Sequence, residues 1–170
     1  AQHLVRKRAT RRGHTYPGAT SVRDALVPIA IAANADLLLH IIDFNGVVRF
    51  SELEALGRTH SDNLTWAGAD TIHIVDEDAD LSQISGGQLD AMRARYRAVH
   101  GSIDFFLVRR SGWVCRSPNA WRVVEYWLQE RHSRDGQGTE VYLAATLQDL
   151  GELFSVEELD AVGARKSFVE

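Results

Sequence analysis

Residues 69–89, ADTIHIVDEDADLSQISGGQL, decide the fold that this chain can adopt. The stretch begins with a short apolar run that is typical of a strand. The run ends at an acidic cluster, and a Ser/Gly segment then leads into a helix. Because ligands bind α/β domains most often where a strand passes into a helix at its carboxyl end, we expect the functional edge of the protein here.

The segments that follow this stretch alternate between helical and strand patterns. Leu89, Met92 and Tyr96 recur at helical spacing and predict an amphipathic helix. Beyond it the sequence predicts a central strand at IDFFLV (103–108) and a helix that begins at Ser117 and Pro118. A strand at VYLAAT (141–146) and a brief helix over 147–154 follow. The last predicted helix is capped by Ser155 and Glu158.

The segments that precede the stretch predict a hairpin and a helix. Two apolar runs, LVPIAIAA (26–33) and LLLHIIDF (37–44), flank a short turn. Ser51 and Glu54 form a capping box, which predicts a helix over the residues that follow. The element order is therefore β-β-α-β-α-β-α-β-α. Since each helical crossover returns the chain to the same edge of a sheet, we expect an α/β fold with a mixed, mostly parallel sheet.

Composition and charge divide the chain into an arm and one domain. The 170 residues are 45% apolar and 25% charged, which is ordinary for a globular protein. The first twelve residues hold five Lys or Arg and no acid, so we assign residues 1–21 to a basic arm with its linker and residues 22–170 to a single domain. Residues 13–170 carry 14 basic against 23 acidic side chains, which disfavours nucleic acid as a partner except through the arm.

The sequence has the features of a cytoplasmic protein. No apolar run reaches the roughly 20 residues that a membrane span requires, and no apolar leader segment follows the basic residues near the N-terminus. The single cysteine, Cys115, cannot form an internal disulfide, which favours a reducing compartment. We therefore expect a cytoplasmic protein without a membrane span.

Three segments of the chain resemble the STAS-like family of bacterial anti-sigma-factor antagonists, in particular its shorter divergent branch. They are GVVRFSELEAL (46–56), IHIVDEDADLS (72–82) and YLAATLQDLGELF (142–154). The resemblance implies a STAS-like fold and a non-enzymatic regulatory module that binds a protein partner. In better-known members, an Asp-Ser-Ser-Gly-like segment at a helix start carries a Ser that a partner kinase phosphorylates. The corresponding segment here is Ile84-Ser85-Gly86-Gly87, so the resemblance makes Ser85 the first candidate phosphosite and Ser82 the second.

The acidic cluster could bind a cation or dock a partner. It consists of Asp76, Glu77, Asp78 and Asp80. Carboxylate oxygens are ligands for Mg²⁺ and Ca²⁺, but an EF-hand loop that began at Asp76 would need Gly and Glu where Leu81 and Gly87 stand. We therefore favour a docking surface formed by the four acids together with Gly86 and Gly87, and we assign no metal, cofactor or catalytic residue.

Large aromatic residues gather between positions 113 and 127. The group consists of Trp113, Trp121, Tyr126 and Trp127. The spacing places Trp127 on the packing face of a helix, which leaves Trp113 and Trp121 to line a groove or a contact between subunits. Aromatic side chains are enriched at interfaces because they give a large contact area at a small entropic cost. We include Trp113 and Trp121 in the interaction surface and expect a homo-oligomer.

These features support three functional hypotheses. The first is a protein-interaction and regulatory module that acts through the acidic strand-to-helix loop and is not an enzyme. The second is a small-ligand or lipid carrier, which would need a cavity between helix and sheet beside Phe105, Phe106 and Trp127. The third is a metal-dependent hydrolase at Asp76, Asp78 and Asp80. No hypothesis uses His40 or His73, which fall inside apolar strands and are expected to be hydrogen-bonded core residues.

Overall fold

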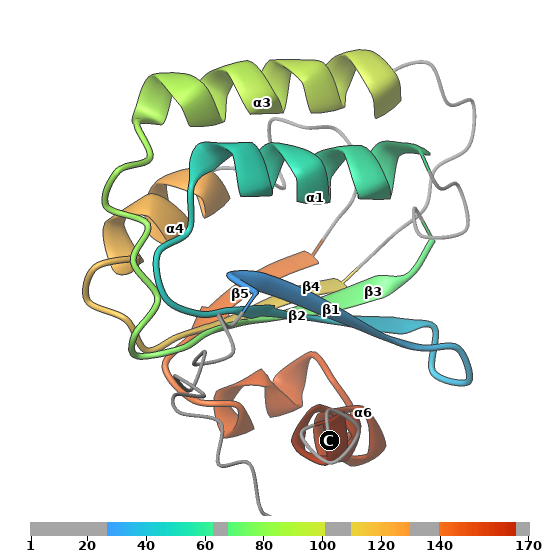
Figure 1. The fold of residues 1–170 in the computed structure, drawn as a ribbon. Coiled ribbons are helices and arrows are strands. Elements are labelled where there is room, and N and C mark those ends of the chain that lie inside the picture. The colour runs from blue at the N-terminus through green and yellow to red at the C-terminus, as the bar shows by residue number, and fades with distance from the viewer. Residues whose placement is uncertain (1–26, 63–67, 101–109, 130–139, 166–170) are drawn as a thin grey trace, which may run out of the picture.

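The computed structural model describes residues 27–62, 68–100, 110–129 and 140–165 (Figure 1). Its elements are, in chain order, β1 (Ile29–Asn34), β2 (Leu39–Phe44), α1 (Phe50–Asp62), β3 (Asp70–Val75), α3 (Gly86–His100), β4 (Arg110–Cys115), α4 (Trp121–Leu128), β5 (Glu140–Ala144), the 3-10 helix η1 (Gln148–Glu152) and α6 (Val156–Ala164). The N-terminal arm assigned to residues 1–21 lies outside the described residues.

The five strands form one sheet in the order β1-β2-β3-β4-β5. β1 pairs antiparallel with β2, as the hairpin pattern predicted, and the pairs β2–β3, β3–β4 and β4–β5 are parallel. The structure thus confirms the α/β class with a mostly parallel sheet. Because strand order follows chain order, each crossover moves the chain by one strand in the same direction. The crossover helices α1, α3 and α4 consequently form a helical layer over one face, and η1 and α6 cover the other (Figure 1).

The strands carry apolar residues on both faces because both faces of the sheet are covered. Successive side chains of a strand point to opposite faces, so Ile72 and Ile74 of β3 face α6 while Val75 faces the helical layer. The core under the helical layer includes Ile42, Phe44, Val48, Leu53, Val75, Leu89, Met92, Trp113, Val124 and Leu128. The core on the α6 side includes Leu39, Ile41, Ile72, Ile74, Val114, Leu150, Phe154 and Val162.

β4 is a strand that the sequence pattern did not predict. The apolar run at 103–108 lies outside the described residues, and the strand that pairs with β3 is Arg110–Cys115. Its sequence, RSGWVC, lacks a continuous apolar run. Gly112 has a packing reason, because a Cβ at this position would lie 2.8 Å from atoms of both Leu150 and Phe154. The segment around η1 therefore packs directly onto the main chain of β4.

The caps of the later helices were predicted with mixed success. Ser155 Oγ accepts from Glu158 N, and Ser155 N donates to Glu158 Oε2 at 2.7 Å, so the predicted capping box of α6 is confirmed. Ser117 instead caps a turn, because its Oγ accepts from Ala120 N at 3.2 Å and α4 begins only at Trp121. The predicted start of that helix at Ser117 is therefore too early.

The predicted capping box of α1 is wrong. The helix begins one residue before Ser51, so Ser51 lies in the first turn and not at the cap position. Glu52 closes the turn by accepting a hydrogen bond from Arg49 N at 2.5 Å. Glu54 instead pairs with Arg95 of α3 at 2.5 Å, which joins the two longest helices of the helical layer.

Candidate functional site

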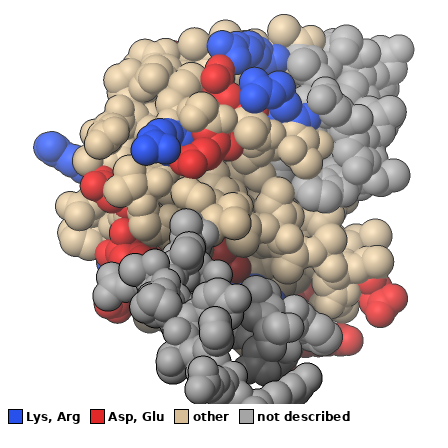
Figure 2. Space-filling view, in the orientation of Figure 1, with Lys and Arg blue, Asp and Glu red and all other residues tan. Residues whose placement is uncertain are grey.

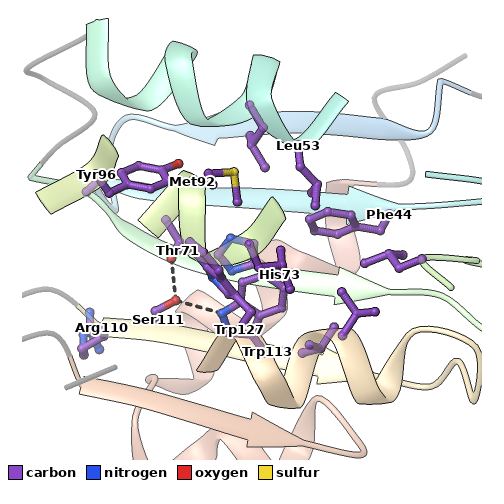
Figure 3. Close-up of a pocket in the computed structure, with 16 residues that line it drawn as sticks. Phe44, Leu53, Thr71, His73, Met92, Tyr96, Arg110, Ser111, Trp113 and Trp127 are labelled. Carbon is purple, nitrogen blue, oxygen red and sulfur yellow. Dashed lines mark hydrogen bonds between the residues drawn. The ribbon is translucent and has the colours of Figure 1, made fainter. Parts of the chain in front are cut away.

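A pocket of about 100 Å³ lies between the sheet and the helical layer (Figure 3). The strands line it with Phe44, Thr71, His73, Ser111 and Trp113, and the helices line it with Leu53, Leu56, Leu89, Met92, Tyr96, Val123, Val124 and Trp127. We call this space the helix–sheet pocket. Because an engineered cavity of roughly 150 Å³ accepts benzene, its volume is of the order that holds a small ring or several waters.

One wall of the helix–sheet pocket is a stack of aromatic rings. His73 and Trp113 are Cα partners in the β3–β4 ladder, and both line the pocket. Their rings are stacked, with centroids 3.8 Å apart and planes 6° from parallel. The Phe44 ring lies 5.9 Å from the Trp113 ring. Strand pairing thus fixes a flat surface against which a ligand ring can pack.

Hydroxyl groups form the polar part of the helix–sheet pocket (Figure 3). Thr71 and Ser111 are also Cα partners, and Thr71 Oγ1 lies 3.1 Å from Ser111 Oγ. Trp113 Nε1 donates to Ser111 Oγ, also at 3.1 Å. Within the Thr71–Ser111 pair only one hydroxyl can donate to the other, so the second O–H has no acceptor among the described residues. That O–H is a donor available to a ligand.

Contacts between helices hold the other side of the helix–sheet pocket in place. Arg93 of α3 is buried, donates to the main-chain oxygens of Tyr126 and Trp127 in α4, and lies 5.2 Å from the centroid of the Trp127 ring. Gly57 lets α1 approach α3 closely, since a Cβ on Gly57 would lie 2.8 Å from Tyr96 Oη. These contacts position Tyr96 and Trp127, whose ring centroids lie 6.1 Å apart.

Arg110 lines the helix–sheet pocket at the start of β4, but its charge is committed to acidic partners. Its Nε donates to Asp70 Oδ2 at 2.9 Å, its Nη2 to Glu158 Oε1 at 2.6 Å and its Nη1 to Leu153 O at 2.7 Å. Hydrogen bonding to Glu158 raises the pKa of Arg110. Burial opposes the charge of Glu158, but hydrogen bonds from Arg110 and Ser155 outweigh burial and lower the pKa of this carboxyl. The described lining of the pocket contains no Asp or Glu.

The predicted docking surface connects β3 to α3. Its exposed members are Glu77, Asp78 and Gly87, and its half-buried members are Asp76, Asp80 and Gly86. The candidate phosphosites Ser82 and Ser85 are also exposed. The carboxylate of Asp80 accepts from Ser82 N at 2.9 Å. Hydrogen bonds from the side chain and the main chain of Ser82 lower the pKa of the Asp80 carboxyl. Asp76 likewise accepts from Glu77 N at 3.0 Å, so two of the four acids shape the loop, while Glu77 and Asp78 are exposed.

The main chain of this loop is anchored to neighbouring segments. Asp80 N donates to Gly46 O at 2.7 Å, and Val48 N donates to Asp80 O at 2.9 Å. Ser117 Oγ donates to Ala79 O at 2.5 Å. The loop consequently presents its acids from a fixed backbone.

Ser85, the first candidate phosphosite, is the N-cap of α3. Gln88 N donates to Ser85 Oγ at 3.3 Å, and Ser85 N donates to Gln88 Oε1 at 2.9 Å, which makes a reciprocal cap. Gly86 follows directly beneath Tyr126, since a Cβ at Gly86 would lie 3.2 Å from that ring. Ser85 and Gly86 thus have structural roles, whereas a Cβ at Gly87 would meet no atom within 4 Å.

Charged side chains do not gather into a metal site in the part of the chain that the structure describes. No three His, Cys, Asp or Glu side chains there are placed to hold a metal ion together. Figure 2 shows one face of the molecule, on which acidic and basic side chains are interspersed among uncharged ones without a large patch of one sign. The hydrolase hypothesis gains no support from these residues.

The two tryptophans assigned to the interaction surface lie in different environments. Trp113 is 6% exposed and lines the helix–sheet pocket, so it lies inside the molecule and not on its outer surface. Position 113 belongs to a central strand, where the sequence pattern placed no element. Trp121 begins α4 and is 37% exposed, which leaves it available on the surface.

Sequence reasoning missed the polar part of the helix–sheet pocket. Thr71 and Ser111 were not candidates, although a hydroxyl residue at a covered position of a central strand is a usable signal for Thr71. Ser111 gave no such signal because β4 itself was missed. Trp127 lines the pocket, as the carrier hypothesis requires, whereas Phe105 and Phe106 lie outside the described residues.

Comparison with known proteins adds no assignment. No model of a known family, no curated protein and no solved structure matches the chain. Among the helices that the structure describes, none has the length and apolar character needed to cross a membrane. The geometry of the helix–sheet pocket is therefore the basis for a functional proposal.

Proposed function

We propose that this protein binds a small, ring-containing ligand of low polarity in the helix–sheet pocket. The observation that carries the proposal is a space of about 100 Å³ with an aromatic wall and one available hydroxyl donor. Ligand sites are mostly apolar concavities with a few placed polar groups. Because packed interiors contain few voids larger than a water molecule, a space of this size between sheet and helices supports a binding role.

The lining indicates the chemistry of the ligand. The stacked rings of His73 and Trp113 favour a planar ring. The available O–H of the Thr71–Ser111 pair favours an oxygen acceptor on the edge of that ring. A cationic ligand is disfavoured, because the described lining has no carboxylate to compensate its charge. A neutral phenol-like molecule combines these properties.

The proposed activity is binding without catalysis, as in the non-enzymatic role that the STAS-like resemblance implies. A STAS-like fold, a regulatory role and a cytoplasmic location belong to this proposal and rest on the sequence pattern. The protein would then act as a carrier or a sensor of its ligand.

Phenol and benzene are the probes that test this function. We expect phenol to bind about fivefold more tightly than benzene, because one additional hydrogen bond contributes about 1 kcal/mol. Ligand-observed NMR and tryptophan fluorescence report binding, since Trp113 and Trp127 line the pocket. The double change Thr71→Val with Ser111→Ala should remove the preference for phenol. Absence of binding by both probes at millimolar concentration would contradict the proposal.

A pocket-filling variant provides the spatial control. Ala69 lines the helix–sheet pocket, so Ala69→Leu should occupy the space and weaken both probes. Ala94→Leu adds the same atoms to an exposed position of α3 and should leave binding unchanged. Equal binding by the two variants would show that the probes bind elsewhere.

A second candidate function is the docking of a protein partner on residues 76–87. It is favoured by the anchored main chain of this loop, because a surface that is already ordered loses little entropy on binding. Phosphorylation at Ser85 would add negative charge at the start of α3, where the helix dipole favours it. Pull-down with the Asp78→Lys and Ser85→Glu variants tests this function, and unchanged recovery of partners by both would count against it.

A further inference from the structure

β5 is an outer strand of the sheet that the described residues form. It pairs with β4 on one side, and no strand in the described ranges pairs with its other side. An edge strand of this kind presents main-chain N–H and C=O groups that can accept an additional strand.

Hollows lie on both sides of this edge. One of about 620 Å³ lies between β5 and α4, and its lining includes Val141, Leu143 and Leu128. The other, of about 420 Å³, lies between β5 and η1, and its lining includes Tyr142 and Gly151. An added strand alternates its side chains between the two faces of the sheet, so successive residues would enter the two hollows in turn.

The two hollows differ in charge. Asp149 and Glu152 line the hollow on the η1 side, and the exposed Glu140 alternates to the same face of β5 as Tyr142. The hollow on the α4 side contains one base and one acid, Arg122 and Glu125, beside apolar residues. The η1 side is therefore acidic, whereas the α4 side is balanced and partly apolar.

We propose that the β5 edge docks an extended segment of another protein in which apolar residues alternate with Lys or Arg. The apolar residues would face the hollow beside α4, and the basic residues would face the acids beside η1. The ring of Tyr142, which is 43% exposed, would form a cation–π contact with one of the basic side chains. Main-chain hydrogen bonds would supply affinity and the alternation would supply specificity. This site is separate from the helix–sheet pocket and does not depend on the function proposed for it.

Charge favours such a segment over a second copy of this chain. Pairing two β5 edges would bring Glu140, Asp149 and Glu152 of both copies to one boundary. Like charges placed opposite each other across a strand pair are destabilising. A basic partner segment removes this repulsion and replaces it with attraction.

Fluorescence anisotropy with a short labelled peptide, in which Val alternates with Lys, tests the site on the full chain. We expect Glu140→Lys combined with Glu152→Lys to weaken peptide binding by about tenfold or more, since both acids would face its lysines. Glu157→Lys combined with Asp160→Lys makes the same charge change at exposed positions of α6 and should leave binding unchanged. Circular dichroism melts confirm that both variants fold.

Peptide chemistry separates strand addition from simple charge attraction. N-methylation of alternate residues blocks the hydrogen-bond donors on one edge of the peptide, so one of the two possible methylation patterns should abolish binding and the other should not. The proposal is overturned if neither pattern matters, or if a peptide with its valines and lysines in separate blocks binds equally well. It is also overturned if the peptide binds only after Arg6→Gln and Arg8→Gln, because the chain's own arm would then be the occupant. The proposal is likewise overturned if the protein forms a dimer and the Glu140→Lys, Glu152→Lys variant alters the dissociation of that dimer. The occupant of the β5 edge would then be a second copy of this chain.

Discussion

Gly112 determines how closely the segment around η1 can approach β4. A Cβ at this position would lie 2.8 Å from Leu150 Cδ1 and from Phe154 Cε2, both in the packed core on the α6 side. We expect Gly112→Ala to lower the free energy of unfolding by about 1–3 kcal/mol, because overpacking forces neighbouring side chains or the backbone to shift. Urea denaturation followed by circular dichroism measures this change.

Gly151→Ala is the matched control for that measurement. A Cβ at Gly151 would meet no atom within 4 Å, so the same chemical change should alter stability by no more than about 0.5 kcal/mol. If the two variants lost equal stability, the close approach at Gly112 would not be the cause.

Some interactions between residues close in sequence could be predicted, whereas those between distant residues could not. The cap formed by Ser155 and Glu158 follows from a three-residue spacing and was predicted correctly. Glu158 also binds Arg110, 48 residues away, and Arg110 in turn binds Asp70, 40 residues away. No local pattern indicates these partners, because only the folding of the sheet brings them together.

The ion cluster of Arg110, Asp70 and Glu158 attaches α6 to the sheet and makes this attachment depend on pH. The pKa of Glu158 is lower in the folded protein than in the unfolded chain. Ionised Glu158 therefore contributes stability that is present above its unfolded pKa of about 4.3 and is lost as the pH falls through the lower folded value.

We expect Glu158→Gln to be less stable than the parent protein by about 2 kcal/mol near neutral pH, since it loses a charged hydrogen bond to Arg110. The difference should shrink on acidification, because the parent loses its charge at this position as well. Thermal denaturation at a series of pH values measures both curves. Glu157→Gln, at an exposed position of the same helix, should give a curve parallel to the parent. A constant difference between Glu158→Gln and the parent would show that the charge of Glu158 is not responsible.

Local periodicity predicted most elements but failed at β4. The segments of β2, LHIIDF, and β3, DTIHIV, are rich in apolar residues, and both were predicted as strands. The segment RSGWVC of β4 carries Ser111 and Gly112 for reasons that lie in other elements: one bonds to Thr71 and Trp113, and the other makes room for η1. A strand whose composition is set by its neighbours cannot be recognised from its own pattern.

The two cores share one sheet, so the described part of the molecule should unfold as one cooperative unit. Phe154 belongs to the core on the α6 side, whereas Trp113 belongs to the core under the helical layer and Trp127 of α4 packs against that core. We expect Phe154→Leu to lower stability by about 1 kcal/mol. Its unfolding midpoint should shift equally when it is followed by tryptophan fluorescence and by far-ultraviolet circular dichroism. Two separate transitions would show that the cores unfold independently.

The sequence predicted a cavity between helix and sheet only as the requirement of one functional hypothesis. Its aromatic lining was partly visible, since Trp127 was placed on a packing face and a cavity beside it was the stated requirement of the carrier hypothesis. Its volume depends on the space that remains after α1, α3 and α4 pack on the sheet, and Gly57 and Arg93 influence that space from positions outside the lining. The volume of the pocket is therefore set by how the assembled layers pack, and the pattern of a single segment cannot indicate it.

The match between strand order and chain order also has a consequence for the newly made chain. Each strand from β2 to β5 can pair with its predecessor as soon as it is synthesised, and the crossover helices cover one face of the sheet in step with it. Among the described elements, η1 and α6 cover the other face, which includes Ile41, Ile72 and Val114, and these two elements are synthesised last. The described helices therefore leave this apolar face uncovered until η1 and α6 are made. We expect the chain to be most prone to aggregation during that interval, which the docking of α6 ends.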